Sequence, residues 1–202
     1  MQIEDPATAV GILKDMAKAR LVIGLKLPQG FAYRPEFLTT EEEQALLAHI
    51  RYLDFRAFNF QGYVARRRIV DYGYEYDFTK RQTSATRPIP EFLEPLRAKA
   101  AEFAGVAAVE IAECIITEYP PGAPIGWRRD VRQFEIVIGI SLAGRCRMRF
   151  KPHKGEGKPV SVELEPRSAY IMSGPARWDF QHSIPPVKDL RYSITFRTLR
   201  AD

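Results

Sequence analysis

Cysteines and long apolar runs are scarce in this chain, and each shortage argues against a class of protein: disulfide-rich or zinc-binding proteins in the first case and membrane proteins in the second. The 202 residues include only two cysteines, Cys114 and Cys146, which are too few for a disulfide framework and lack the Cys-x-x-Cys spacing of a zinc or redox site. We therefore expect both to be small buried hydrophobic side chains. No apolar run approaches the roughly 18 residues that a membrane helix needs, and the first residues lack the basic start and apolar core of a signal peptide. These absences predict a cytoplasmic protein without membrane contact.

The composition that remains is typical of a folded domain. Hydrophobic residues make up 46% of the chain and charged residues 27%, so a sizeable core is expected and global disorder is excluded. Nothing marks a domain boundary or an internal repeat, which predicts a single domain over residues 1–202. The net charge of +5 is compatible with a polyanionic partner and is also ordinary for a soluble enzyme.

Three helices are predicted in the first half of the chain. Residues 6–20 place apolar side chains at helical spacing. Thr40 and Glu43, three residues apart, are typical of a capping box at the start of a second helix. A third helix within residues 90–104 ends before Gly105, and a proline in its first turns predicts that it begins late.

From about residue 111 the pattern changes to short strands, which we expect at residues 134–142, 145–150, 160–164, 169–172, 178–181 and 191–198. In the second of these, Cys146, Met148 and Phe150 face one way and three arginines face the other, so we expect a solvated arginine face. Many short strands after a helical half predict an α+β fold, a β-sandwich or barrel flanked by helices.

The last strand, read in "LRYSITFR", alternates strictly. Its polar face carries Arg191, Ser193, Thr195 and Arg197. This face either meets solvent or forms a pocket wall, where guanidinium groups suit a dicarboxylate through paired hydrogen bonds. The two arginines are about 20 Å apart along an extended strand, so they would hold one small ligand from opposite ends.

Asp130 and His182 are a carboxylate and an imidazole that carry little meaning alone. Non-haem iron oxygenases, however, hold Fe(II) with two histidines and one carboxylate, leaving the other positions for co-substrate and oxygen. A His-x-Asp pair in an extended segment presents both side chains on one face, and a distant histidine completes the triangle.

Four segments in the right order carry a resemblance to a known family: "EYPPGAPIGWRRD", "GISL", "SGPARWDFQHSIPP" and "RYSITFR". Together they resemble the AlkB family of Fe(II)- and 2-oxoglutarate-dependent dioxygenases, particularly its short bacterial members. The match covers residues 114–200. The resemblance implies a double-stranded β-helix, or jelly roll, over about residues 111–202, with helices and a nucleotide-recognition lid over about residues 1–110.

The resemblance also implies roles for individual residues. It assigns Asp130 and His182 as iron ligands, and it assigns Tyr119 and Arg191 to the far carboxylate of 2-oxoglutarate and Arg197 to its near end. Ser193 and Thr117 belong to the same co-substrate site, although Thr117 stands where the family has asparagine, so one hydrogen bond is altered or lost. The cofactors implied are Fe(II), 2-oxoglutarate and O2.

Arg128 stands where the family has the first histidine of its His-x-Asp motif. A guanidinium has five donors and no acceptor lone pair and stays protonated, so it cannot coordinate Fe(II). Arg129 cannot replace it for the same reason. Only Asp130 and His182 remain as ligands, and Arg128 either turns outward or pairs with Asp130. The sequence therefore predicts a weakened iron site.

Aromatic residues are concentrated between Tyr52 and Phe78, where they account for nine of 27 residues. Arg66, Arg67 and Arg68 lie among them, so cationic side chains accompany flat rings, as phosphate binding and base stacking require. The family has its lid here, with Tyr72 and Tyr76 as candidate base contacts. The alternative is that these tyrosines pack on the barrel.

The substrate implied is an alkylated base in DNA or RNA, single-stranded or flipped from the stack. Removing its N-methyl group by oxidation would release formaldehyde. Trp127 and Trp178 either line the substrate pocket or support the barrel. Two other hypotheses stay open: an inactive relative that binds damaged nucleic acid, and a dioxygenase for a protein side chain or small molecule.

Overall fold

The computed structural model of the chain describes residues 27–60, 63–77 and 82–201. Its strands are β1 (Phe31–Arg34), β2 (Arg56–Phe60), β3 (Tyr63–Asp77), β4 (Gln82–Ala85), β5 (Ile111–Tyr119), β6 (Ile125–Arg128), β7 (Phe134–Leu142), β8 (Cys146–Pro152), β9 (Val160–Leu164), β10 (Ala169–Met172), β11 (Phe180–Ile184) and β12 (Arg191–Leu199). Its helices are α2 (Thr40–Ile50), α3 (Glu94–Ala104) and α4 (Gly174–Trp178), and the 3-10 turns η1 (Glu91–Leu93) and η2 (Ala108–Glu110) flank α3. The helix expected over residues 6–20 lies outside the described residues.

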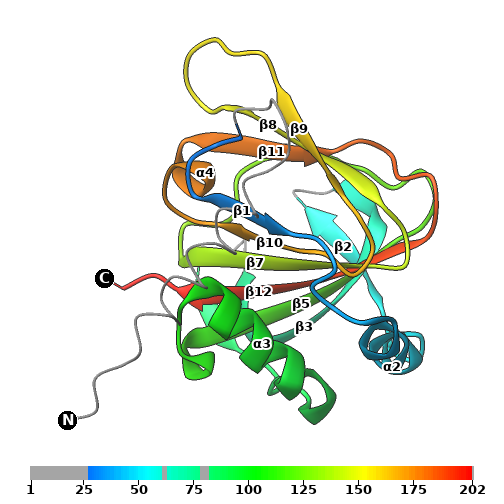
Figure 1. Ribbon diagram of the computed structural model, residues 1–202. Helices are drawn as coiled ribbons and strands as arrows, with labels where there is room; N and C mark the ends of the chain where they lie inside the picture. The colour runs from blue at the N-terminus through cyan, green and yellow to red at the C-terminus, as the bar shows by residue number, and fades with distance from the viewer. Residues whose placement is uncertain (1–26, 61–62, 78–81, 202) are drawn as a thin grey trace, which may run out of the picture.

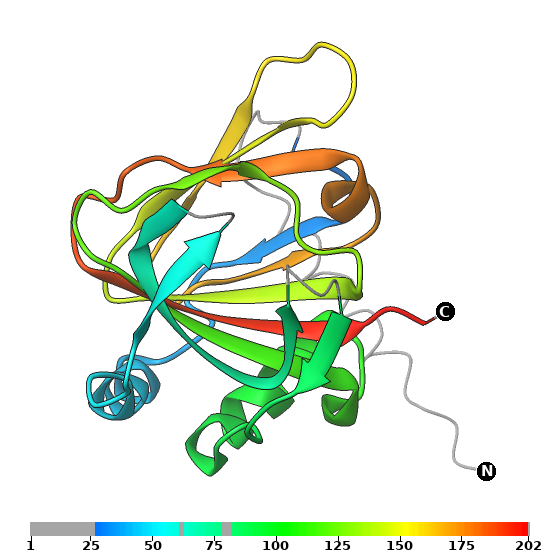
Figure 2. The ribbon, with the colours of Figure 1, turned by 180° about the vertical axis from the view of Figure 1, so that it is seen from behind.

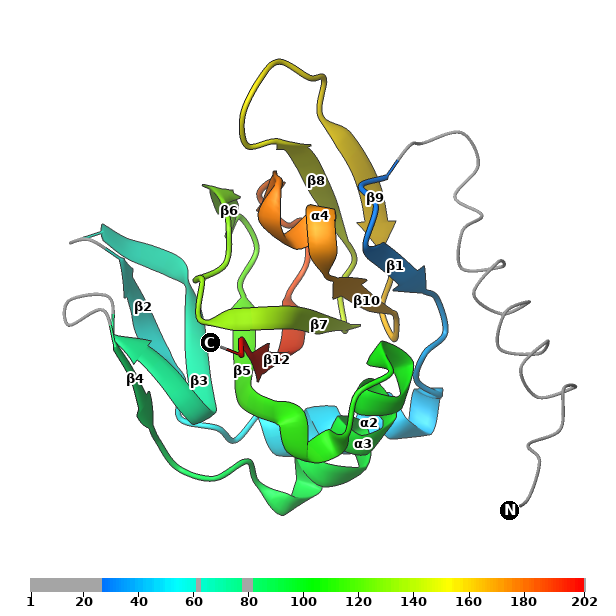
Figure 3. The ribbon, with the colours of Figure 1, turned by 90° about the vertical axis from the view of Figure 1, so that its left-hand side faces the viewer.

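Two antiparallel sheets form the body of the molecule. The large sheet has the order β1-β10-β7-β12-β5-β3-β2, with β4 paired to β3, and the small sheet has the order β6-β11-β8-β9. Figure 1 shows the small sheet above the large one and α2 and α3 below it. In Figure 2, from behind, β2 and β3 lie on the near side. Figure 3 shows β2, β3 and β4 on one side of the molecule and β1 and β9 on the other.

Two apolar clusters hold these layers together. The cluster between the large sheet and the helices includes Ile50, Leu93, Ile116, Ile140, Ile194 and Phe196. The cluster between the two sheets includes Val137, Met148, Phe150, Leu164, Met172 and Ile184. Cys114 belongs to the first cluster and Cys146 to the second, and both are free thiols. The prediction that the cysteines are small buried hydrophobic residues is confirmed.

The capping box of α2 is one residue earlier than the sequence predicted. The N-cap is Thr39, whose side chain accepts from the Glu42 backbone N–H at 3.2 Å, while the Glu42 carboxylate accepts from the Thr39 N–H at 2.8 Å. Glu43 is buried and accepts from the Ala143 backbone N–H at 2.9 Å. The run "TTEEE" fits the capping spacing in two registers, and the contact with Ala143 engages Glu43 elsewhere.

The expected strand at residues 178–181 was wrong at its start. Residues 174–178 form α4, with Pro175 in the first turn, where its missing N–H costs nothing. The strand begins at Phe180 instead. The third helix does begin late, at Glu94, and ends before Gly105, whose φ of 69° is left-handed. No helix among the described residues is long and apolar enough to cross a membrane.

Candidate active site

Asp130 and His182 meet between the two sheets. Asp130 follows β6 and His182 lies on β11, and they are 9% and 8% exposed. The His182 Nε2 atom lies 3.9 Å from Asp130 Oδ2. Arg128 is the direct partner of His182 in the pairing of β6 with β11. The small sheet therefore brings together the three positions that the sequence singled out.

The protonation states of this pair suit metal binding. Burial lowers the pKa of His182 to about 4. The charge of Asp130 raises this pKa, whereas the charges of Arg128 and Arg197 lower it. Burial raises the pKa of Asp130, but the charges of Arg197, His182 and Arg128 outweigh burial and hold this pKa well below its usual range. Near neutral pH the imidazole is neutral, with a free lone pair, and the carboxylate is ionised.

Arg128 shares the inward face of the small sheet. Direct partners across antiparallel strands share a face, and His182 is paired with Arg128 on one side and with Phe150, which is 0% exposed, on the other. The charge of Arg128 acts on both Asp130 and His182. Among residues 27–60, 63–77 and 82–201, no three histidine, cysteine or acidic side chains group as metal ligands. The donor set is thus one ligand short of a two-histidine, one-carboxylate site.

Arg197 reaches the same carboxylate from the large sheet. Its Nη2 donates to Asp130 Oδ1 at 2.7 Å, and its Nη1 donates to Glu113, which is 2% exposed. Burial raises the pKa of Glu113, while the charge of Arg197 opposes that rise. Sequence reasoning missed Glu113, although its alternation with Thr117 and Tyr119 on β5 places it on the inward face. One guanidinium therefore pairs with two buried carboxylates.

Arg191 lies at the other end of β12 and is prepared for an anion. It is 1% exposed, its Nε donates to Ser141 Oγ at 3.0 Å, and its guanidinium lies 4.8 Å from the centre of the Tyr119 ring. Its buried Nη1 has no hydrogen-bond partner. Ser193 and its β5 partner Thr117 are also buried along this wall. The alternative of a solvent-facing polar strand was wrong, because this face is buried, and its role as the wall of a co-substrate pocket stays a prediction.

These residues fit the expected cofactors unequally. The unpaired Nη1 of Arg191 is a donor that a carboxylate would satisfy, so the co-substrate end of the site fits. The iron end fits poorly, because Asp130 and His182 supply two ligands where three are needed. Arg197 already occupies one carboxylate oxygen of Asp130.

Arg177 is a further residue that the sequence did not single out. It lies on α4, is 2% exposed, and donates from Nη2 to the carbonyl oxygens of Val131 and Phe134, the latter at 2.9 Å. These two carbonyls bracket the loop that follows Asp130. Arg177 therefore fixes the conformation of this loop and positions Asp130.

The three consecutive arginines of the expected lid diverge. Arg68 donates from Nε to Glu118 at 2.6 Å. The exposed Arg66 lies against Gly122, in the turn after β5. Arg67 is half-buried and, by the alternation of β3, shares the face of Ile69, the direct partner of Thr117. Arg67 therefore faces the site, Arg66 lies at the turn after β5, and Arg68 fastens β3 to β5.

The tyrosines of the lid differ in the same way. Tyr72 is 4% exposed and packs in the cluster between the large sheet and the helices, with Arg87 over its ring at 4.5 Å. This position favours the packing alternative for Tyr72. Tyr74 is 37% exposed, and the side chain of Tyr76 lies outside what the structure describes.

The two tryptophans lie apart. Trp178 ends α4, donates from Nε1 to Glu135 at 3.2 Å and lies beneath the guanidinium of Arg200 at 5.0 Å, contacts that favour a supporting role. Trp127 alternates with Arg128 on β6 and so lies on the outer face of the small sheet. The side chains of Arg149 and Lys151 lie over its ring. The predicted solvated face of Arg145, Arg147 and Arg149 was wrong for Arg149, which is half-buried.

Comparison with known proteins agrees with this geometry. The model of the 2OG-Fe(II) oxygenase superfamily matches residues 30–197. The chain is 30% identical over 213 residues to an Arabidopsis thaliana protein, "Alkylated DNA repair protein ALKBH8 homolog", covering 87% of this chain and 60% of that protein. It is 28% identical over 137 residues to the Escherichia coli "Alpha-ketoglutarate-dependent dioxygenase AlkB", covering 62% of this chain and 63% of that protein. The chain thus spans less than two thirds of the length of both relatives.

A solved structure supports the fold. The structure of OsALKBH1 superposes with a TM-score of 0.67 at 15% sequence identity, covering 86% of this chain and 99% of that one. The expected α+β jelly roll is confirmed by this likeness together with the two facing sheets. The chain belongs to the 2OG-Fe(II) oxygenase superfamily, in which it is AlkB-like.

Proposed function

We propose that this chain is a 2-oxoglutarate-dependent oxygenase for alkylated nucleic acid bases, with an iron site impaired by Arg128. The observation that carries this proposal is the position of Arg128, which is directly paired with His182 and stands two residues before Asp130, whose pKa its charge lowers. A histidine at this position would complete the ligand set of Asp130 and His182. The guanidinium instead adds a positive charge where a cation should bind.

The co-substrate end of the site would work through the residues of β5 and β12. Arg191 and Tyr119 would bind the far carboxylate of 2-oxoglutarate, because the buried Nη1 of Arg191 lacks a partner. Ser141 holds Arg191 in position through its Nε. Ser193 and Thr117 would line the chain of the co-substrate, and Arg197 would face its near end. Fe(II), where bound, supplies the oxidising chemistry together with O2.

The substrate end rests on the lid and on the relatives. An Arabidopsis thaliana relative carries alkylated DNA repair in its name, and on β3 Arg67 faces the site while the exposed Arg66 lies at the turn after β5. Cations at this edge would contact the phosphates beside a base that has left its stack. Tyr76 and Tyr74 are the candidate stacking rings, and Trp178 acts as support for the loop rather than as a base contact.

The test compares turnover in the chain as given with that in Arg128→His. Succinate and formaldehyde release are measured on methylated and unmethylated oligonucleotides with Fe(II) and 2-oxoglutarate. Arg128→His should raise succinate release by at least about tenfold, as expected when a metal site gains strength. Formaldehyde should appear only with the methylated strand. Vigorous turnover by the chain as given would show that another ligand serves in place of residue 128.

A second candidate function is binding without catalysis. The observation in its favour is the closed ionic network, in which Arg197 pairs with Asp130 and Glu113 and satisfies the carboxylate without a metal. Such a protein would bind modified single strands, and this binding would weaken with salt. If Arg128→His binds Fe(II) but the chain as given binds methylated strands and releases no formaldehyde, this second function is the correct one.

A further inference from the structure

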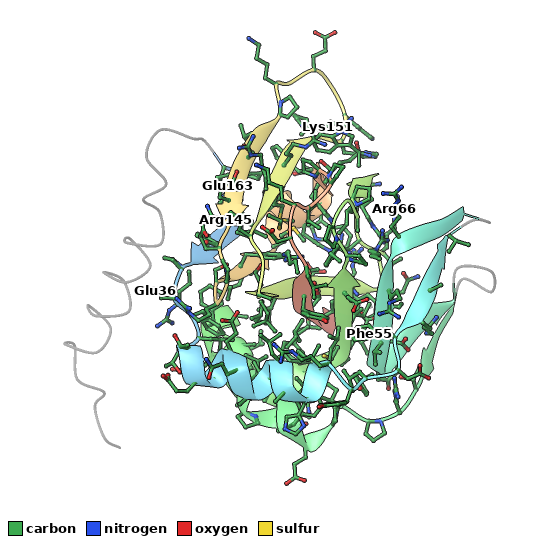
Figure 4. All side chains as sticks on the ribbon, turned by 90° about the vertical axis from the view of Figure 1, so that its right-hand side faces the viewer. Glu36, Phe55, Arg66, Arg145, Lys151 and Glu163 are labelled. Carbon is green, nitrogen blue, oxygen red and sulfur yellow. The ribbon has the colours of Figure 1, made fainter. Side chains whose placement is uncertain are left out.

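The outer face of β8, together with Arg145 directly before it, carries four cations in two different electrostatic settings. Arg145 lies 3.8 Å from Glu165 and Arg147 lies 2.5 Å from Glu163, so neighbouring carboxylates on or after β9 neutralise both. Arg149 and Lys151 have no carboxylate within ion-pair distance among the described residues. Figure 4 shows Lys151 at the opposite end of the strand pair from Arg145 and Glu163.

Both uncompensated cations converge on one indole. The guanidinium of Arg149 lies 5.0 Å from the centre of the Trp127 ring, and the ammonium of Lys151 lies 4.7 Å from it. Their neighbours on β11 are Ser183 and Gln181, which are neutral. Arg149 also donates from Nε to Ser183 Oγ at 3.0 Å, which fixes its orientation. We call Trp127, Arg149 and Lys151 the indole patch.

The positive charges of the indole patch are not balanced by a carboxylate within ion-pair distance among the described residues. Two like charges share one ring, and the π-face of the ring offsets only part of their repulsion. An anion next to Arg149 and Lys151 would relieve the remainder. Trp127 is half-buried, so only the part of its ring that the two cations leave uncovered can stack with a nucleobase, a contact that a phosphate alone does not need. The combination favours a nucleotide over an acidic peptide.

The indole patch also adjoins the site. Trp127 directly precedes Arg128 on β6, with one side chain on the outer face and the other on the inner face. Lys151 and Arg149 flank His182 in the same way, because their β11 partners, Gln181 and Ser183, are the residues on either side of it. A nucleic acid strand bound on this face would therefore be separated from the proposed reaction centre only by the small sheet itself.

We infer that the indole patch is a docking site for single-stranded nucleic acid, with a phosphate at Arg149 and Lys151 and a base on Trp127. This inference rests on the proposed function, because it holds the strand that flanks the target base. The indole patch would add a contact surface on the small sheet to the proposed lid on β3, so that the nucleic acid strand would be bound on two sides of the site.

Binding of a fluorescein-labelled oligothymidylate, without metal or 2-oxoglutarate, tests this surface. Affinity is measured by anisotropy over a range of salt concentrations for the full chain, for Lys151→Gln, and for Arg149→Ala combined with Lys151→Gln. The salt slope should fall by about 0.7 for each cation removed. Arg147→Ala is the matched control on the same strand, and it should leave the slope unchanged because Glu163 already neutralises Arg147.

Stacking is tested separately by fluorescence. The chain has two tryptophans, so Trp178→Phe leaves Trp127 as the sole tryptophan, whose emission is excited selectively over that of the tyrosines. The oligonucleotide should quench this emission, and Trp127→Ala should weaken binding by at least about fivefold, whereas Trp127→Phe should retain most of it. A poly-glutamate peptide of matched charge should neither quench nor compete.

Three outcomes would overturn the inference. They are an unchanged salt slope in the double variant, equal losses for Arg147→Ala, and equal binding of poly-glutamate, which would indicate an acidic protein partner. Because these binding assays contain no metal, their results do not depend on whether the proposed oxygenase chemistry occurs. Conversely, turnover of Arg128→His on methylated strands with an inert indole patch would reject only the docking site.

Discussion

Gly139 illustrates how single residues shape the interior of this barrel. It lies on β7 opposite Tyr170 of β10, and the Tyr170 ring occupies the space where a side chain would begin. A Cβ at Gly139 would meet the Tyr170 ring carbons at 2.2 and 2.3 Å, well inside contact distance. Tyr170 therefore depends on a glycine across the sheet to enter the space between the layers.

Gly139→Ala should destabilise the protein by about 1–3 kcal/mol, because the ring must leave its position in a packed interior. Thermal and urea unfolding would measure this loss. Gly126→Ala on β6 is the matched control, since a Cβ there meets nothing within 4 Å. Combining Gly139→Ala with Tyr170→Leu should recover part of the loss, and a purely additive double variant would refute the contact.

Arg128 and Glu113 show what could be read from the sequence at single positions. The proposed ligand position of Arg128 rests on the resemblance of its segment to the family's His-x-Asp motif, and the structure pairs Arg128 directly with His182. Glu113 could not be assigned because its partner Arg197 lies 84 residues away, on a strand whose register no local pattern fixes. Alternation predicts a face, but not which distant side chain shares it.

At the scale of elements, two substitutions at the start of α2 distinguish a capping box that begins at Thr39 from one that begins at Thr40. Thr39→Ala should cost about 1 kcal/mol, because the Glu42 N–H loses its acceptor. Thr40→Ala should change the free energy of unfolding by only a few tenths of a kcal/mol, since Thr40 already lies within the helix. Chemical denaturation of both variants checks the assignment, and the reverse ranking would restore the register that the sequence suggested.

Two arginines of β3, Arg66 and Arg68, are expected to differ in role: Arg68 stabilises the fold and Arg66 contributes to the proposed binding of nucleic acid. Arg68→Ala should lower the free energy of unfolding by up to about 1 kcal/mol, a modest loss because Arg68 is half-exposed and water can reach Glu118. Arg66→Ala should leave stability unchanged and weaken binding of single-stranded oligonucleotides, with a shallower salt dependence. Unfolding curves and anisotropy titrations separate the two effects. Equal stability losses in both variants would contradict this division.

Strand positions from residue 134 onward were the most predictable part of the fold, whereas β1 to β6 had no predicted bounds and tertiary contacts were the least predictable part. β9 and β12 alternate polar and apolar residues, and β7 is a run rich in Ile, so local pattern suffices to find them. The start of β11 was missed because α4 forms there, with the buried guanidinium of Arg177 bonded to carbonyls in another loop. Such long-range contacts override local preference and leave no signal in a short window.

At the scale of the whole molecule, the two sheets present opposite halves of one site. The small sheet carries Asp130, His182 and Arg128, and the large sheet carries Arg191 and Arg197 on its facing side. The outer face of the small sheet adds the indole patch, and the edge of the large sheet adds the arginines of β3. In the proposed function, these two cationic surfaces would bind one nucleic acid strand on either side of the reaction centre.

The central claim is that Arg128 alone separates this site from a complete iron centre. Anaerobic Fe(II) titration of the chain as given, Arg128→His and Arg128→Gln tests it most directly. Arg128→Gln removes the charge without adding an imidazole, so it should gain less affinity than Arg128→His. We predict that Arg128→His binds Fe(II) at least about tenfold more tightly than the chain as given. Equal affinities in all three proteins would contradict the account.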